Sequence, residues 1–156
     1  MPKESAGILA YRIAEGQTEI LLVHPGGPFF VKKDAGVWSV PKGENDNQED
    51  LWDLARREFT EETGNSISSD NYTLLKPVKT KAGKVVHIFA VNENFEIPFI
   101  CSNDFPLEWP PHSGKIQYFP EADKAEWFTF DEAKIKIYAY QLPVLEELSQ
   151  LLNSEH

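Results

Sequence analysis

The sequence of 156 residues contains little cysteine and lacks any long apolar run. Its single cysteine, Cys101, excludes an internal disulfide and a Cys-x-x-Cys metal or redox pair, and a lone thiol of this kind is typical of a small buried side chain. No segment approaches the roughly 20 consecutive apolar residues of a membrane span. The N-terminal residues do not resemble a cleavable leader. We therefore expect a cytoplasmic protein that does not enter the membrane.

Positive charge is also scarce. Fifteen Lys and Arg residues stand against 25 Asp and Glu, which gives a formal net charge of −10. A protein that neutralises nucleic-acid phosphates needs the opposite sign, so general nucleic-acid binding is not expected, although a local basic pocket is compatible with this composition. The hydrophobic fraction of 41% is that of a folded globular chain, and the length fits a single domain spanning residues 1–156.

The patterning predicts both strands and helices. Apolar runs predict strands at residues 7–13, 19–23, 37–40, 84–92 and 126–130, and helical spacing predicts helices at 46–63, 131–136 and 142–152. A Gly- and Pro-rich loop is expected at 24–36. A long loop is expected between residues 93 and 125, where prolines cluster. Strands and helices mixed in this order predict an α+β sandwich.

The predicted helix at 46–63 has an unusual inner face. Asp46 and Glu49 are spaced as a capping pair, and Gly64 is a natural stop. At 100° per residue, Glu58 and Glu62 fall within about 20° of Leu51, on the stripe expected to face the protein. Glu61 lies at the margin of that stripe. The rest of the stripe is apolar and consists of Leu51, Trp52, Leu54, Ala55 and Phe59.

Folding alone does not call for this arrangement. Glutamates spaced three and four residues apart repel, and the helix dipole disfavours anions in the last turns. A hard divalent cation such as Mg²⁺ would resolve the conflict, because it prefers oxygen ligands. The competing interpretation is a solvated acidic helix end.

The spacing of fixed residues now becomes informative. Gly43 is followed after five residues by Glu49, and after seven more by the run Arg57-Glu58-Phe59-Thr60-Glu61-Glu62-Thr63-Gly64. This segment resembles the signature of the Nudix hydrolases, with all seven fixed residue types at the right spacing. One position departs from the pattern: Asn65 occupies the final slot, which is normally apolar, and this bears only on local packing.

The resemblance implies a Nudix-type α/β/α sandwich with a mixed β-sheet. It also implies a pyrophosphohydrolase that uses Mg²⁺ or Mn²⁺ to cleave a diphosphate linkage in a nucleotide. Carried over to this sequence, Glu58, Glu61 and Glu62 would bind metal, with the carbonyl of Lys42 or Gly43 completing the shell. Glu58 would also orient or deprotonate the attacking water. Arg57 and Glu49 would form a supporting salt bridge.

Several roles remain open. A general base outside the signature is expected, and we prefer Glu108, with Glu121 next and Glu93 and Glu96 as further candidates. Lys42 could contact a substrate phosphate or be a solvated lysine. Trp109 could stack on a base or anchor its loop, and the same choice applies to Phe29 and Phe30.

The substrate class is open as well. Dinucleoside polyphosphates and (d)NTPs lead, and the substrate is expected to be a small nucleotide bound by a monomer or homodimer. The alternatives are an ADP-ribose or nucleotide-sugar hydrolase and a catalytically silent nucleotide-sensing module. The intact signature argues against the silent module. Cys101 lies in a proline-rich region, which argues against a prenyl diphosphate isomerase. The Asn45-Asp46-Asn47 loop is incomplete as a calcium loop, which argues against a calcium-binding protein.

Overall fold

A computed structural model describes residues 3–69, 71–94 and 103–154 of the chain. Cys101, predicted to be buried, and Glu96, a candidate base, lie outside the described residues. Among the described residues, no helix has both the length and the apolar character needed to cross a membrane.

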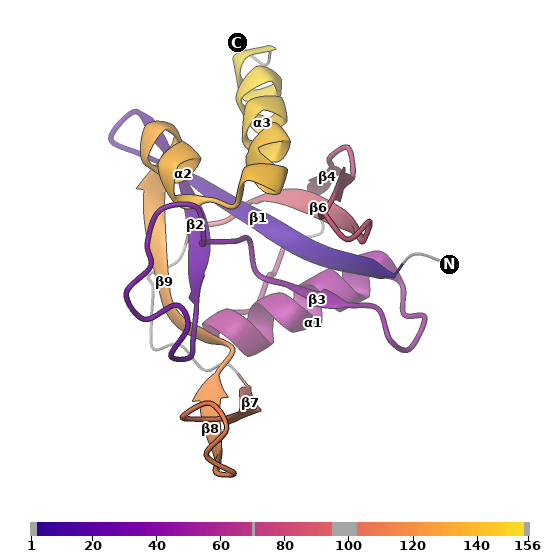
Figure 1. Ribbon diagram of the computed structural model, residues 1–156. Coiled ribbons are helices and arrows are strands. Elements are labelled where there is room, and N and C mark those ends of the chain that lie inside the picture. Colours follow the sequence, from indigo (N-terminus) through magenta and orange to yellow (C-terminus); the bar gives the residue numbers. More distant parts are fainter. Residues whose placement is uncertain (1–2, 70, 95–102, 155–156) are drawn as a thin grey trace.

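A seven-stranded mixed sheet forms the middle of the molecule (Figure 1). Its main path runs β4-β6-β1-β2-β9, with β3 added to β1 and β5 added to β6, and of these pairings only β1 with β6 is parallel. The strands are β1 (Glu4–Ala14), β2 (Gln17–Pro25), β3 (Lys42–Glu44), β4 (Tyr72–Leu74), β5 (Val78–Lys79), β6 (Val85–Asn92) and β9 (Ala122–Thr129).

Two strands share one edge of β1, and this positions the site. Strand β2 pairs with Tyr11 to Ala14 of β1, whereas β3 pairs with Ser5 to Gly7. Where the chain enters β3, a Cβ on Gly7 would lie 2.5 Å from the carbonyl oxygen of Pro41. Only glycine at position 7 therefore allows this close approach of the two backbone segments. Strand β3 is thereby held against the start of β1.

Helices cover both faces of the sheet, so the fold has three layers (Figure 1). Alternate residues of β1 face opposite sides: Ile8 packs on the side of α1 (Leu51–Thr63), and Leu9 packs on the side of α2 (Phe130–Lys136) and α3 (Leu142–Ser154). A short 3₁₀ helix, η1 (Ala139–Gln141), links α2 to α3. The predicted α/β/α sandwich with a mixed sheet is confirmed.

Helix α1 begins five residues later than predicted. Its N-cap is Asp50, whose carboxylate accepts a hydrogen bond from the Asp53 N–H at 3.3 Å, so the predicted Asp46–Glu49 capping pair is wrong. The reason is a competing local structure, because the Asn45 side chain bonds both the N–H and the carbonyl of Glu49, at 2.8 and 3.0 Å. The predicted stop is correct, since Gly64 adopts a left-handed conformation (φ 73°) and donates to Thr60.

Other differences concern the strands. The segment predicted as a long loop contains a two-stranded ribbon, β7 (Asp104–Glu108) and β8 (Ile116–Pro120), which stands apart from the main sheet (Figure 1). Residues 37–40 form isolated bridges rather than the predicted strand, with Ser39 joined to Val23 and Trp38 to Ile137. The short strands β4 and β5 were not predicted.

Candidate functional site

Helix α1 carries Glu58 and Glu62 on the face that packs on the sheet, as the periodicity predicted. Leu54, Ala55 and Phe59 are fully buried against the sheet. Further along the same face, the Glu58 side chain is 15% exposed, and the Oε2 atom of Glu62 is buried with no hydrogen-bond partner. The apolar stripe therefore continues directly into carboxylates held away from water.

Strand β3 passes immediately beside these carboxylates. A Cβ added to Gly43 would lie 2.1 Å from the Glu58 carboxyl carbon, so any larger residue would displace that side chain. The backbone of Lys42 also hydrogen-bonds the Glu62 carboxylate. Gly43 is thus a steric requirement of the site, and the backbone around it lies within reach of both glutamates.

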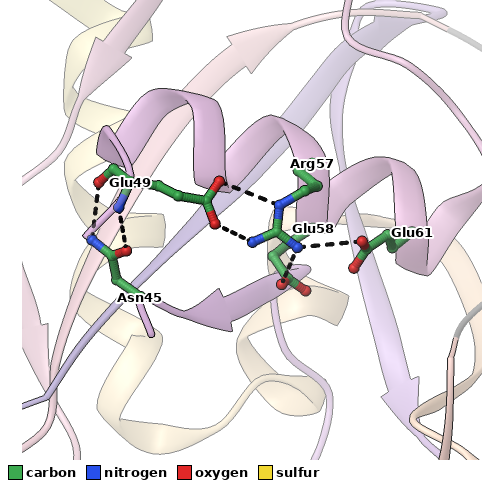
Figure 2. A network of polar contacts seen from close by, with 5 residues as sticks. All are labelled: Asn45, Glu49, Arg57, Glu58 and Glu61. Atoms are coloured by element: carbon green, nitrogen blue, oxygen red, sulfur yellow. Dashed lines mark hydrogen bonds and ion pairs between the residues drawn. The ribbon is translucent and has the colours of Figure 1, made fainter. Parts of the chain in front are cut away.

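Arg57 connects the loop before α1 with the acidic end of the helix (Figure 2). Its Nε and Nη2 bind both carboxylate oxygens of Glu49, and its Nη1 lies 3.3 Å from Oε1 of Glu58 and 3.3 Å from Oε1 of Glu61. Hydrogen bonds to Glu49 keep the pKa of Arg57 above its ordinary value. The Arg57–Glu49 contact implied by the resemblance is present, and Asn45 fixes the backbone that carries Glu49.

The carboxylates repel one another even with Arg57 in place. Burial, followed by the charge of Glu58, raises the pKa of Glu62 to about 8. Burial and the charge of Glu61 raise the pKa of Glu58 above its ordinary value. The cluster of Glu58, Glu61 and Glu62 therefore holds more negative charge than its surroundings balance.

Glu121 joins this cluster from the other end of the chain. It lies at the corner between β8 and β9, where its backbone N–H donates to Asn103 and its carbonyl accepts from Gly26. Partial desolvation and the charge of Glu61 raise the pKa of its carboxyl group. Glu121 was the second choice among the predicted bases.

Two adjoining cavities open onto these residues. One, of about 350 Å³, is lined by Lys42, Gly43, Glu58 and Glu121, together with Glu44, Asp46 and Lys84. The other, of about 320 Å³, has Lys42, Glu62 and Glu121 at one end and Val23, Pro25, Val37, Ser39, Val40, Tyr138 and Tyr140 around the remainder. Lys42 and Glu121 line both, so they stand where the two cavities meet. We call these the carboxylate cavity and the tyrosine cavity.

The structure does not bring every predicted residue to these cavities. Glu108 ends β7, where it is exposed and accepts from the His112 N–H at 3.0 Å. Trp109 packs edge-on against Phe29, with ring centroids 5.3 Å apart. Glu93 accepts bonds from the backbone of residues 68 and 69. Among the described candidates for a base outside the signature, Glu121 alone lines either cavity.

The donor set suits a hard cation. In the described part of the chain, no three His, Cys, Asp or Glu side chains are gathered as a ligand set. Glu58 and Glu61 are instead in contact with Arg57. The unpartnered buried oxygen of Glu62 nevertheless requires a proton or a cation. Oxygen donors on one rigid helix, beside a backbone strand, are the ligands that Mg²⁺ and Mn²⁺ accept.

Sequence reasoning missed the two tyrosines that line the tyrosine cavity and Gln141, which hydrogen-bonds the cavity residues Ser39, Val40 and Tyr140. Tyr138, Tyr140 and the buried Gln141 lie between α2 and α3, about 100 positions from Lys42 along the chain. No spacing rule relates them to the signature, and two tyrosines separated by one residue signal nothing on their own.

Comparison with known proteins agrees with this geometry. The NUDIX domain family matches residues 2–148. An Ap4A hydrolase binary complex from C. elegans has a TM-score of 0.63 and 24% identity, over 97% of this chain and 98% of that one. The NUDIX domain of Shewanella oneidensis NrtR, complexed with ADP ribose, has a TM-score of 0.66 and 16% identity, over 97% and 89%. A search of curated proteins gives no match.

Likeness at these identities shows the fold, and the family match spans nearly the whole chain. The chain therefore belongs to the Nudix family, as a hydrolase acting on phosphoanhydride bonds.

Proposed function

We propose that the chain is a metal-dependent pyrophosphohydrolase that cleaves a diphosphate linkage in a small nucleotide. The observation that carries this proposal is the buried Oε2 of Glu62, which has no partner and belongs to a carboxylate cluster in contact with β3. An acidic cluster built for stability would place these oxygens in water or pair each with a base. Here the protein keeps them in a half-buried cluster.

Glu58, Glu61 and Glu62 would hold Mg²⁺ or Mn²⁺, with the backbone at Gly43 beside them. A bound divalent ion would neutralise phosphate oxygens and lower the pKa of a coordinated water. Arg57 would act as a positioning residue, because it bonds Glu58 and Glu61 at one end and Glu49 at the other.

The proton of the attacking water needs an acceptor. Glu58 is the first candidate for this role because its carboxylate lines the carboxylate cavity beside Gly43. Glu121 lines the same cavity and is the second candidate. As a water oxygen bonds to phosphorus, its proton passes to the carboxylate, and the bond between phosphorus and the bridging oxygen breaks, releasing the second phosphate.

Positive side chains would hold the substrate. Lys42 stands where the two cavities meet and would bind a phosphate on either side of the scissile bond. Lys84 lines the carboxylate cavity, where it pairs with Glu44. Trp109 was expected to contact substrate, but it packs on Phe29 away from both cavities, so we assign the substrate contact to Lys42.

Dinucleoside polyphosphates and (d)NTPs lead as substrates, and the likeness to the C. elegans Ap4A hydrolase supports the former. ADP-ribose is the alternative, supported by the likeness to the NrtR domain complexed with ADP ribose. A silent sensing module would also bind a nucleotide. The intact set of four signature glutamates, Glu49, Glu58, Glu61 and Glu62, favours turnover over sensing.

A turnover screen tests the proposal. The protein is incubated with Mg²⁺, Mn²⁺ or EDTA and with diadenosine tetraphosphate, (d)NTPs, ADP-ribose and a nucleotide sugar, and the products are separated by chromatography. We expect metal-dependent cleavage of at least one compound, abolished in Glu62→Gln and retained in Glu146→Gln, an exposed control on α3. Binding without cleavage would support the sensing module. Equal activity in EDTA would overturn metal dependence.

A further inference from the structure

His24 is a buried histidine near the end of β2, where this strand pairs with the start of β9. Its side chain is 4% exposed, and each of its ring nitrogens lies within hydrogen-bond distance of an oxygen atom. We propose that His24 carries a proton on both ring nitrogens and acts as a positioning residue, which holds Glu121 at the carboxylate cavity. The inference rests on the proposed function for the reaction, but not for the ring protons or the place of Glu121.

The two oxygen atoms beside the ring belong to groups that accept hydrogen bonds. Nδ1 lies 2.8 Å from Oδ1 of Asp123, and Nε2 lies 2.6 Å from the backbone carbonyl oxygen of Lys33. A neutral imidazole has one N–H, so it would bond one of these oxygens and turn a lone pair toward the other. The imidazolium form has an N–H for each of them. Because the side chain is almost wholly buried, water does not replace a lost contact, and the geometry favours the doubly protonated ring.

The charged groups around the ring are consistent with a positive charge on it. Asp123 approaches from β9, and Asp34 lies on the loop that returns to the ring, where its carboxylate accepts from Trp38 Nε1 at 2.8 Å and pairs with Lys136 of α2. Hydrogen bonds from Lys136 and Trp38, followed by the charges of Lys136 and His24, hold the pKa of Asp34 below its ordinary value. The Trp38 ring packs on the His24 ring, with centroids 5.1 Å apart. The imidazolium is therefore held between carboxylates and an aromatic ring.

The contact with Asp123 fastens a bulge in β9. His24 lies opposite Lys124, whereas the next residue of β2, Pro25, lies opposite Ala122. The register therefore slips by one residue, and Asp123 has no partner on β2. An extra residue of this kind bends its strand and re-aims the side chains beside it. The hydrogen bond from Nδ1 of His24 holds the extra residue in place.

Glu121 lies two residues before Asp123, directly beyond the bulge. Its carbonyl accepts from the Gly26 N–H at 3.0 Å, so the chain that leaves His24 also bonds this corner. His24 thus acts on the corner in two ways: Nδ1 binds the bulge, and Nε2 binds Lys33 in the loop that begins at Gly26. Glu121 lines both cavities, whereas His24 lines neither. The position of the carboxylate therefore depends on a residue that does not touch the substrate.

The ring protons are tested on the wild-type chain without metal or substrate. The chain is labelled with ¹⁵N, and long-range proton–nitrogen correlation spectra of the histidine rings are recorded at about pH 8, where a solvated histidine is neutral. We expect two protonated nitrogens for His24, whose signals are assigned by their loss in His24→Asn. One protonated and one bare nitrogen would overturn the inference, whether or not Asp123 holds the missing proton.

Two substitutions separate the two contacts of the ring. The amide nitrogen of asparagine can replace Nδ1, and that of glutamine can replace Nε2. His24→Asn should therefore keep the bond to Asp123 and lose the bond to Lys33, whereas His24→Gln should do the reverse. Deuterium exchange at the Gly26 N–H reports on the corner without turnover. We expect exchange to accelerate about tenfold or more in His24→Gln and less in His24→Asn. The matched control His112→Gln, at an exposed histidine, should change nothing. Equal rates in wild type and His24→Gln would overturn the inference.

Turnover connects the position of Glu121 to the reaction. On a nucleotide cleaved in the screen, His24→Gln should lower kcat about tenfold and change KM by less than about twofold, because it misplaces a carboxylate at the reacting phosphate and removes no substrate contact. His24→Asn should retain most of the wild-type kcat. Glu121→Gln should lower kcat at least about tenfold, and adding His24→Gln should lower it no further, since both changes act through one group. Additive losses, or a normal kcat in Glu121→Gln, would overturn the inference.

Exchange and turnover together separate this inference from the proposed function. If no nucleotide is cleaved, but His24 has two ring protons and His24→Gln speeds exchange at Gly26, the proposed function fails and the positioning of Glu121 stands. If nucleotides are cleaved, but His24→Gln keeps normal kcat and slow exchange, the positioning role fails and the proposed function stands. Should His24→Gln not fold, Asp123→Ala removes the same contact from the partly exposed side and carries the same expectations.

Discussion

Two polar clusters lie on opposite sides of the segment that leads into β3, and they are built in opposite ways. Around Gln141, which is fully buried, the side-chain amide has a partner at both its oxygen and its nitrogen. Around Glu62, a buried carboxylate oxygen has none, and the neighbouring side chain of Glu58 carries the same charge. The first arrangement contributes to stability, whereas the second lowers it unless a proton or a cation is bound.

This difference in hydrogen-bond pairing indicates which of the two clusters serves a ligand. Buried polar groups in folded proteins are almost always paired, so the Gln141 cluster needs no explanation beyond folding. The Glu62 cluster is only partly compensated, since Arg57 reaches Glu58 and Glu61 and no contact from Arg57 to Glu62 is found in the described region. We therefore attribute the uncompensated charge to metal binding.

The largest expected effect is on catalysis. Glu58→Gln removes both a proposed ligand and the proposed base, so turnover should fall by about 10²–10⁴-fold. Activity is measured on the substrate from the screen, with circular dichroism as a check on folding. Glu146→Gln should retain full activity. A folded Glu58→Gln protein with normal kcat would contradict the role of this residue.

The next effect is on the pH dependence of stability without metal. The pKa of Glu62 is raised from 4.5 to about 8 in the folded protein. Its contribution to the free energy of unfolding is therefore fully favourable below pH 4.5 and is lost as pH rises through 8. In EDTA, Glu62→Gln should therefore gain stability over wild type between pH 5 and pH 8, on the order of a few kcal/mol. Urea denaturation at the two pH values measures the change, and a constant difference would contradict it.

The same measurement on the other cluster should give the opposite sign. Gln141→Leu leaves the Val40 N–H and its other partners unpaired in a buried site, so it should destabilise the protein by about 1–3 kcal/mol. The loss should be similar at pH 5 and pH 8, because no carboxylate is involved. A stabilising effect would show that the two clusters are not opposites.

The smallest expected effect is that of changing Arg57, which links Glu49 to the carboxylates of Glu58 and Glu61. Arg57→Lys keeps the positive charge but removes the planar fork that reaches Glu49, Glu58 and Glu61 together. We expect kcat to fall about tenfold, the lower end of the effect of losing a group that orients metal ligands. Melting temperature should change little because the arginine side chain is 42% exposed and its ion pairs are partly screened by water. An unaltered kcat would assign Arg57 to charge balance alone.

The carboxylate face of α1 was predictable because helical periodicity is local: Glu58 and Glu62 follow Leu51 and Leu54 on one stripe. The start of the helix was not, since Asn45 captures the backbone of Glu49 through contacts that propensities do not reveal. The β7–β8 ribbon was not predicted because it contains Pro106 and Pro120, and proline disfavours strands except at sheet edges and strand ends.

The tyrosine cavity could not be predicted from the sequence, for a different reason. It arises where Tyr138 is held by the carbonyl of Trp38, and where Gln141 bonds Val40 across about 100 positions of sequence. Such long-range convergence has no signature in one sequence. Glu121 was the second candidate for the base from the sequence, but its place beside the carboxylates depends on the long-range pairing of β9 with β2.

The most direct test of the central claim is to measure Mn²⁺ binding at neutral pH, by electron paramagnetic resonance and calorimetry, in wild type, Glu62→Gln and Glu146→Gln. If the Glu62 cluster is held for a cation, wild type and Glu146→Gln should bind Mn²⁺ equally, and Glu62→Gln should bind it at least about tenfold more weakly. Equal binding by all three proteins would contradict the account.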